Sequence, residues 1–377
     1  MRDVTAERSP FRSFFMAGFE CSSQRRGDGR RLDLLASTAH DRFAAEDYRA
    51  AAAQGLLTAR DGIRWHRVEA QPGRYDWSSV LPQLHAARAA GVQVIWDLCH
   101  YGCPDHLEIW RPAFVEAFAR YAAAFARLLR EEGETAPCLV PVNEISFWAW
   151  AAGDQGLFDP KTRGRGQELK HQLVRASIAA IEAIRAELPD ARFVLADPLI
   201  NVVARRPEQR EAAEAHRQAQ FEAWDLLSGR QWPGLGGRPE YLDILGLNYY
   251  PHNQWYLGGE TLAVGDPAYR PLQGMLTEVH QRYGRPLLIA ETGAEGPMRA
   301  AWLELVADQV GRVLRQGVPV QGICLYPVLD YPGWDDDRLC PTGLFGVADG
   351  AGRRILHEPL AEVLQRQRQV LAGGEAR

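Results

Sequence analysis

Short apolar runs alternate with longer segments of mixed polarity along the whole chain. The runs have the residue composition of strands, with Val, Ile, Leu, Phe and Cys prevailing over four to eight positions, which is typical of strands buried on both faces. Eight such runs predict strands within residues 14–21, 56–64, 92–98, 138–146, 192–197, 241–250, 286–293 and 320–327.

The segments between the runs predict helices. The clearest signal is an apolar stripe in which Phe114, Phe118, Tyr121, Phe125 and Leu128 follow one another at steps of four and three, as the core-facing positions of a long helix do. That stripe indicates packing and carries no chemistry. Further helices are predicted within residues 41–54, 78–90, 207–227, 298–316 and 357–370, before Tyr283, and in a segment that ends near Pro189.

Eight strand–helix units without a linker-like break predict an α/β fold, namely one (β/α)8 TIM barrel with long βα loops that spans residues 1–377 as a single domain. The loops after the strands of such a barrel share one face, and the active site lies there. Polar residues at or just beyond the predicted strand ends are therefore the candidates for function: Glu20, Arg60, His100, Asn143, Glu144, Asn248, Tyr250 and Glu291.

Composition and charge exclude several classes of partner. A formal net charge of -5 argues against a surface built for nucleic acid. No apolar run approaches the roughly 20 residues of a membrane span, and residues 1–12 are polar, so we expect no membrane contact and a cytoplasmic location. The six cysteines are scattered and read as reduced core residues, and Cys99 and Cys103 have no second pair at the spacing of a zinc site.

Glu144 and Glu291 are the candidate catalytic pair, because each ends a buried strand and a barrel brings such ends together. Two carboxyl groups about 5 to 5.5 Å apart cleave glycosides with retention of configuration, and a separation beyond about 6.5 Å indicates inversion. Burial beside Trp148 and the charge of Glu291 are expected to raise the pKa of Glu144, so that it can act as the acid. Trp148 is also a candidate surface for stacking on a sugar ring.

Several strand ends carry motifs that resemble the family 1 β-glycosidases of glycoside hydrolase clan A. In that family the fourth strand ends in Asn-Glu and the seventh in Glu, which implies that Glu144 is the acid/base and Glu291 the nucleophile. The segment Leu98–Pro104 is similar to the family motif Leu-Tyr-His-Trp-Asp-Leu-Pro, which implies that His100 binds a sugar hydroxyl. The segment Asp243–Tyr250 matches almost residue for residue, which implies that Tyr250 contacts the nucleophile and Asn248 lines the site.

Other positions follow the family pattern less closely. Arg60 falls where the clan keeps an arginine beside the nucleophile, and Arg64, of the same strand parity, is the alternative. Gln24 lies near the position of the family's sugar-binding Gln, at a spacing shorter by one residue. After the eighth strand Trp334 is kept, whereas Tyr326 replaces the platform Trp and Gly333 replaces the Glu that grips the sugar.

The resemblance implies a retaining β-glycoside hydrolase, similar to β-glucosidases and exo-acting, with a carbohydrate substrate and no cofactor or metal. The altered strand-eight loop leaves open a sugar-binding barrel that has lost catalysis. A metal-dependent hydrolase built on Asp97, His100 and the acidic segment 335–337 is a second alternative. A further interpretation is that Arg25, Arg26, Arg30 and Arg31 receive an anionic sugar. The sequence sets neither the sugar nor the oligomeric state.

Overall fold

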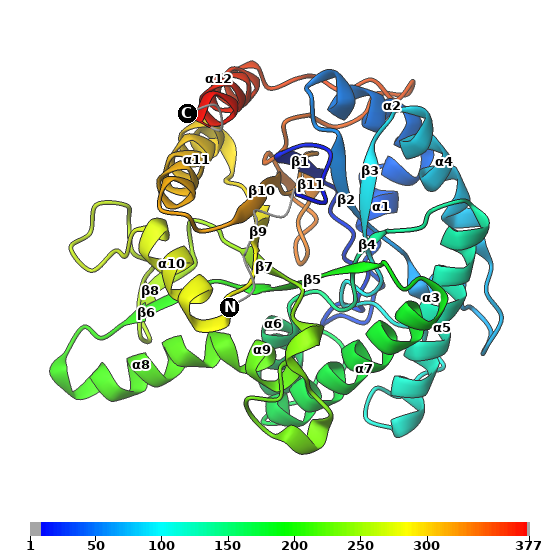
Figure 1. Cartoon of the computed structure of the whole chain (residues 1–377), viewed down its shortest axis with the longest axis horizontal. Helices are drawn as coiled ribbons and strands as arrows, with labels where there is room; N and C mark the ends of the chain where they lie inside the picture. The colour runs from blue at the N-terminus through cyan, green and yellow to red at the C-terminus, as the bar shows by residue number, and fades with distance from the viewer. Residues whose placement is uncertain (1–8, 375–377) are drawn as a thin grey trace.

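Eight parallel strands close into a barrel in the computed structural model, which describes residues 9–374 (Figure 1). Neighbouring strands follow the order β1-β2-β3-β4-β5-β7-β9-β10, and β10 pairs with β1 to close the ring. All eight predicted strands are confirmed, and with them the (β/α)8 fold. Their bounds are β1 Phe15–Gly18, β2 Thr58–Gly62, β3 Gln93–Asp97, β4 Cys138–Val140, β5 Arg192–Pro198, β7 Ile244–Asn248, β9 Leu287–Thr292 and β10 Val320–Leu325.

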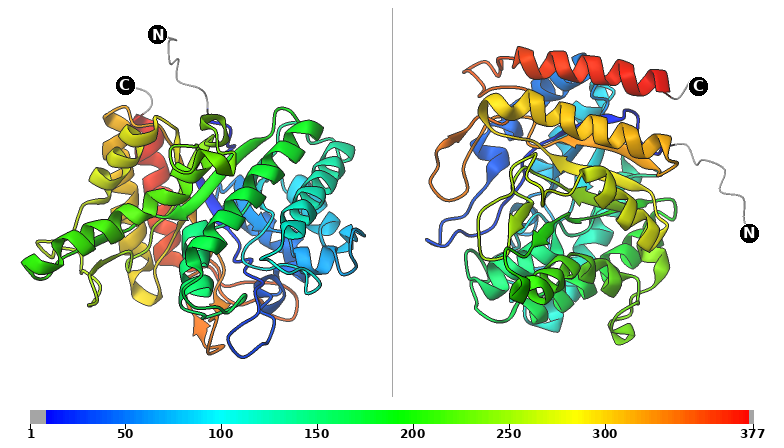
Figure 2. Two further views of the ribbon diagram at one scale, coloured as in Figure 1. Left: turned by 90° about the horizontal axis from the view of Figure 1, so that it is seen from below. Right: turned by 90° about the vertical axis from the view of Figure 1, so that its left-hand side faces the viewer.

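Helices surround the barrel, and the longest cover its outer face (Figure 1). The apolar stripe from Phe114 to Leu128 lies on α5 and is buried, and α5 packs along α7. The helices α11 and α12 lie side by side, as both views of Figure 2 show. The α-helices are α1 Leu34–Ser37, α2 His40–Ala53, α3 Trp65–Val68, α4 Leu81–Ala89, α5 Pro112–Glu131, α6 Ile145–Trp148, α7 Gly166–Glu187, α8 Arg210–Gln218, α9 Glu222–Leu227, α10 Leu272–Tyr283, α11 Arg299–Arg315 and α12 Glu358–Gly374.

The strands are mostly buried on both faces, which explains why most of them are rich in apolar residues, and β2 is the exception because it buries Arg60 and Asp61. One face packs against the helices. The other fills the barrel with a separate cluster of side chains that includes Met16, Ile95, Val194, Leu288 and Cys324. The six cysteines are free, as expected. Within residues 9–374 no helix combines the length and the apolar character needed to span a membrane.

The predicted helix at 207–227 is helical along its length but not uniform. One turn of 3-10 helix at Ala219–Phe221 joins α8 to α9. Burial changes at this turn, since α8 buries only Ala213 whereas Phe221 and Trp224 are buried in the core. The segment after β2, expected to be a loop, also contains the short helix α3.

Two small sheets lie outside the barrel. β6 (Asn201–Val203) pairs with β8 (Gln254–Tyr256), and both segments belong to loops that follow barrel strands. β11 (Tyr331–Pro332) and β12 (Leu339–Cys340) form an antiparallel hairpin in the loop after β10. This hairpin occupies the position where the sequence departs from the family 1 pattern.

Candidate active site

Glu291 ends the apolar part of β9 and is held by two donors. Arg60 Nη1 lies 2.8 Å from Glu291 Oε1, and the Tyr250 hydroxyl donates to Glu291 Oε2 at 2.8 Å. Asn248 is the register partner of Glu291 on the neighbouring strand β7, so the pairing of two strands brings Tyr250 to this carboxylate. Only 5% of Glu291 is exposed.

Arg60 is a fully buried cation inside the barrel. Its Nε and Nη2 donate to the two oxygens of Asp97 at 2.9 and 2.7 Å, and Nη2 also donates to Asn143 Oδ1 at 2.7 Å. Two carboxylates, Asp97 and Glu291, therefore offset the cost of burying one guanidinium. The alternative arginine, Arg64, lies elsewhere, paired with Asp33 and Asp41.

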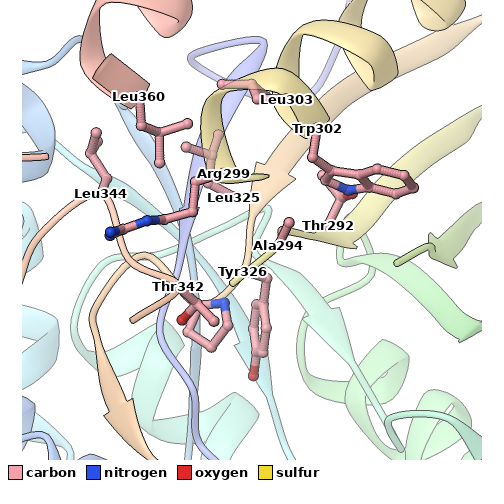
Figure 3. Close-up of a pocket in the computed structure, with 12 residues that line it drawn as sticks. Thr292, Ala294, Arg299, Trp302, Leu303, Leu325, Tyr326, Thr342, Leu344 and Leu360 are labelled. Atoms are coloured by element: carbon pink, nitrogen blue, oxygen red, sulfur yellow. The ribbon is translucent and has the colours of Figure 1, made fainter. Parts of the chain in front are cut away.

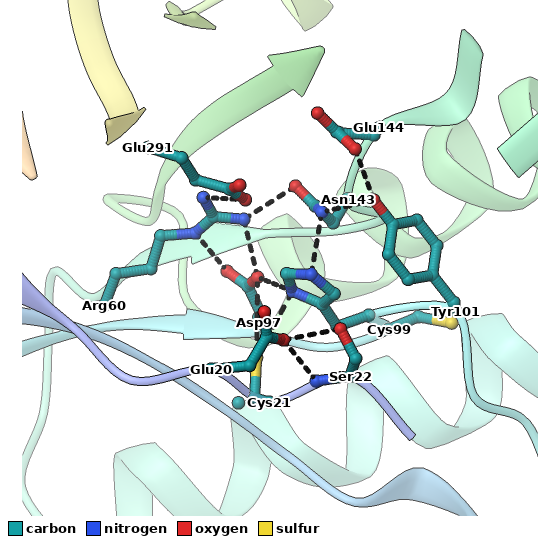
Figure 4. Close-up of polar contacts among 12 residues, drawn as sticks. Glu20, Cys21, Ser22, Arg60, Asp97, Cys99, Tyr101, Asn143, Glu144 and Glu291 are labelled. Carbon is teal, nitrogen blue, oxygen red and sulfur yellow. Dashed lines mark hydrogen bonds and ion pairs between the residues drawn. The ribbon is translucent and has the colours of Figure 1, made fainter. Parts of the chain in front are cut away.

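Glu144 is held by neutral donors alone. The Tyr101 hydroxyl donates to Glu144 Oε2 (Figure 4). Asn248 Nδ2 donates to Glu144 Oε1 at 3.0 Å. The backbone of Glu144 has φ 45°, an unfavourable conformation for a residue with a side chain. Its N–H donates to the Ala196 carbonyl of β5, which fixes the turn. Unlike Glu291, this half-buried carboxyl has no cation in contact with it among the described residues.

The electrostatic environments of the two carboxyl groups differ. Burial raises the pKa of both. At Glu291 the Arg60 guanidinium lowers the pKa against that effect, while the charge of Glu144 raises it. At Glu144 the hydrogen bonds from Tyr101 and Asn248 oppose the effect of burial. Since like charges in one buried site are costly, the pair holds a proton more readily than a carboxyl in water does.

Asn143 lies between the two carboxyl groups in the view of Figure 4 and connects their partners. Its Nδ2 donates to His100 Nε2 at 2.9 Å and to the Tyr101 hydroxyl at 3.0 Å. His100 Nδ1 donates to Asp97 Oδ2 at 2.8 Å, so both ring nitrogens have protein partners. His100, predicted to bind a sugar hydroxyl, thus holds Asn143 and Asp97 in this structure.

Solved structures share this architecture at low sequence identity. A family 1 β-glucosidase from Thermotoga maritima superposes with a TM-score of 0.77 at 16% identity, over 94% of this chain and 97% of that one. The AHE enzyme from Alicyclobacillus herbarius gives 0.79 at 18% identity, over 95% and 98%. The fold is that of the family 1 β-glucosidases. No family model and no curated protein matches the sequence, so the likeness is one of structure.

At the strand-eight side, the site of this family 1 fold is closed by the β11–β12 hairpin. Trp334 at its tip contacts the rings of Tyr101, Phe147 and Phe158 at centroid distances of 5.5 to 6.2 Å. Trp148 meets Tyr101 edge-on and donates from its indole N–H to the Asp159 carbonyl. Trp148 is only 1% exposed, so its ring is buried in the aromatic cluster and is not open for stacking on a sugar ring.

Two cavities adjoin these residues. One is lined by Tyr101, Trp148, Trp110, Arg25 and Arg31. The other lies between β9, β10 and α11, is lined mainly by apolar side chains such as Trp302 and Leu303, and has Tyr326 at its edge (Figure 3). Neither Glu144 nor Glu291 lines these two cavities, although Tyr101, which bonds Glu144, lines the first.

Tyr326 belongs to the barrel interior. Its ring lies parallel to that of His100 at 6.0 Å and beneath the Arg60 guanidinium, whose carbon is 5.3 Å from the ring centroid. Gly18 on β1 leaves the space for this ring, since a Cβ there would come within 2.2 Å of it. The residue that replaces the family's platform Trp therefore supports the buried cation.

The metal alternative does not fit the side chains that would serve it. Possible ligand atoms of Cys21, Asp97 and His100 lie within 4.8 Å of one another. Both oxygens of Asp97, however, already bind the Arg60 guanidinium, which places a fixed positive charge at the proposed site. Burial also raises the pKa of the Cys21 thiol well above its usual range, which disfavours the thiolate that a metal needs.

Two residues at the candidate site have contacts that were not predicted: Tyr101, which had no predicted role, and Asp97, which was considered only as a metal ligand. Tyr101 follows His100 where the family has Trp, and its φ of 67° turns the ring back toward Glu144. Asp97 ends β3 with its carboxylate against Arg60 on β2. The role of Asp97 could have been found in the sequence, because Asp97 and Arg60 lie on neighbouring strands and point to the same side of the sheet. An arginine that points into a barrel needs a nearby carboxylate.

Proposed function

We propose that the protein is a retaining β-glycoside hydrolase in which Glu144 is the acid/base and Glu291 the nucleophile. The observation that carries this proposal is the difference in partners. Glu291 is bound to a buried guanidinium, whereas Glu144 receives only neutral hydrogen-bond donors. A proton shared by the pair therefore favours Glu144, because placing it on Glu291 would leave Arg60 with less opposing charge.

The steps follow from these protonation states. Glu291 attacks the anomeric carbon as a carboxylate, while Glu144 gives its proton to the departing oxygen. Forming the glycosyl ester removes the charge of Glu291. Glu144, now ionised, takes a proton from the water that releases the sugar. The solved relatives in this fold include β-glucosidases of Thermotoga maritima bound to glucoimidazole and deoxynojirimycin, which supports a carbohydrate substrate.

An activated 2-fluoro glycoside tests the proposal. Its fluorine slows hydrolysis of the ester, so the adduct can be seen by intact mass and located by peptide mapping. We expect a panel of such sugars to give one adduct at Glu291 and none in Glu291→Gln. Glu144→Gln should still be labelled, because the activated leaving group needs no acid. Labelling at another residue, or inversion in the product of the wild type, would overturn the assignment.

The altered strand-eight loop favours a second candidate function, namely a sugar-binding protein without catalytic activity. Measuring turnover distinguishes an enzyme from a binding protein. Hydrolysis of aryl β-glycosides that falls at least 1000-fold in Glu144→Gln and Glu291→Gln supports an enzyme, whereas binding of deoxynojirimycin without Glu-dependent turnover on a broad panel supports a binding protein.

A further inference from the structure

Asp335 and Asp336 of the strand-eight hairpin are exposed to solvent. Gly333 stands where family 1 enzymes carry a Glu that binds the sugar, so that carboxylate is missing. Asp337 does not replace it, because its two oxygens bind Arg26 and Arg30 at 2.6 and 3.1 Å. The hairpin is thereby tied to the loop after β1.

Glu20 is a buried carboxylate with an unused oxygen. It lies two residues beyond β1, and β1 runs between β2, which carries Arg60, and β10, which leads to Tyr326. Oε1 accepts from the Ser22 N–H at 3.0 Å and from its hydroxyl at 2.5 Å. Within residues 9–374 no hydrogen bond reaches Oε2 and no cation pairs with Glu20, although only 7% of the residue is exposed.

The charge of Glu20 acts on the catalytic centre. It contributes to raising the pKa of Glu291 and of the Tyr250 hydroxyl, after the larger effect of burial. Figure 4 draws Glu20 in the same group of side chains as Asp97, Arg60 and Glu291. Arg60 already binds Asp97 and Glu291, so its charge is not available to Glu20.

A second unpaired group lies on the same loop. Gln24 is 2% exposed, and its Oε1 has no hydrogen-bond partner. Each of the nearby arginines has a carboxylate partner, since Arg25 and Arg31 share Asp105 while Arg26 and Arg30 bind Asp337 and Asp28. An anionic sugar would therefore meet an unpaired carboxylate and no unpaired arginine of this group.

Resting on the proposed function, we propose that Glu20 is a specificity-determining residue whose Oε2 accepts a hydrogen bond from a donor on the glycone, either a hydroxyl or an ammonium group. Glu20 takes the place of the missing strand-eight carboxylate and excludes uronic and phosphorylated sugars. A buried acceptor that loses its donor is costly, which gives the site its discrimination.

The test compares wild type, Glu20→Gln and the control Glu69→Gln on 4-nitrophenyl β-glycosides. Glu69 is as deeply buried but bonds Trp65 and the Gly73 N–H, away from the carboxyl pair. For the wild type we expect kcat/KM on neutral or amino sugars at least 100-fold above that on the glucuronide. Glu20→Gln should reduce this ratio at least 10-fold, because it removes both the acceptor charge and the repulsion. Glu69→Gln should leave the ratio within twofold.

The substrates also distinguish the two donors. A larger loss on the glucosaminide than on the glucoside in Glu20→Gln identifies an ammonium group, and equal losses identify a hydroxyl. An unchanged ratio in Glu20→Gln overturns the inference. If that variant melts well below the wild type, Glu20→Asp replaces it. Aspartate keeps the negative charge but has a shorter side chain, so its oxygen lies farther from the glycone. We expect Glu20→Asp to have a lower kcat/KM on the preferred sugar and still to exclude the glucuronide. If either result is not observed, the inference is overturned.

Failure of the proposed function has a different signature. If the wild type cleaves no glycoside, the Kd for deoxynojirimycin is measured by calorimetry to test whether Glu20 contributes to sugar binding. A Kd at least 10-fold weaker in Glu20→Gln than in wild type and Glu69→Gln supports the role of Glu20 in a binding protein, while equal Kd values overturn it. Neither turnover nor binding in the wild type overturns both proposals.

Discussion

We expect the buried residue His40 to contribute to the free energy of unfolding in a pH-dependent way. His40 on α2 is fully buried, with Nδ1 2.8 Å from Asp47 Oδ2 and Nε2 3.1 Å from Asp61 Oδ2. Asp61 also accepts from Tyr48 and Gln83, and Asp47 accepts from Arg354. Burial alone would lower the pKa of His40, but the Asp61 charge and the two hydrogen bonds raise it to about 9.

The size of the effect follows from linkage. Raising a pKa from 6.5 to about 9 corresponds to about 3 kcal/mol of stabilisation by the protonated form. Because the folded-state pKa is the higher one, the contribution is complete below pH 6.5 and is lost as the pH rises through 9. The network matters to the site because Asp61 follows Arg60 on β2 and faces the helices, whereas Arg60 faces the barrel interior.

Urea unfolding of wild type and His40→Gln measures this contribution. We expect the variant to be less stable by about 3 kcal/mol at pH 6, and we expect the difference to shrink to under about 1 kcal/mol at pH 9.5. His85→Gln is the control, since His85 is exposed and bonds only Glu132. A difference between wild type and His40→Gln that stays constant from pH 6 to pH 9.5 would refute a charged His40.

Three further predictions concern single side chains. Tyr101→Phe removes a hydrogen bond that lowers the pKa of Glu144, so the basic limb of the pH profile of kcat/KM should move to higher pH. Tyr249→Phe is the control, because the Tyr249 hydroxyl bonds Tyr269 and its loss should leave the basic limb unchanged. Arg60→Met leaves Asp97 and Glu291 without their cation and should reduce kcat at least 100-fold with a stability loss of about 3 to 5 kcal/mol by urea unfolding. Phe118→Ala empties a fully buried position of α5 and should cost about 3 to 5 kcal/mol with KM unchanged in the folded fraction.

The sequence was sufficient for the barrel because most strands are buried on both faces and carry apolar runs, although β2 includes the buried Arg60 and Asp61. It was also sufficient to place Glu144, Glu291 and Asn248 at one end of that barrel, since strand ends share a face. The spacing left two candidates for the arginine beside Glu291, and the structure selects Arg60 over Arg64.

The parts that escaped prediction depend on loop conformation. Nothing in the residue types around Tyr101 shows that a φ of 67° directs its hydroxyl to Glu144. The turn of 3-10 helix at Ala219–Phe221, within the predicted helix 207–227, is not revealed by the helical periodicity of that segment. The partners of Arg26 and Arg30 lie more than 300 residues away, so their pairing with Asp337 needs the fold.

The changes after β10 are physically linked to those after β1. The β11–β12 hairpin brings Asp337 to Arg26 and Arg30 of the β1 loop. Since those arginines already have carboxylate partners, Glu20 on the same loop keeps a carboxylate that no cation of the described residues binds. The ion pairs that hold the hairpin therefore also leave Glu20 free to bind the glycone, as proposed.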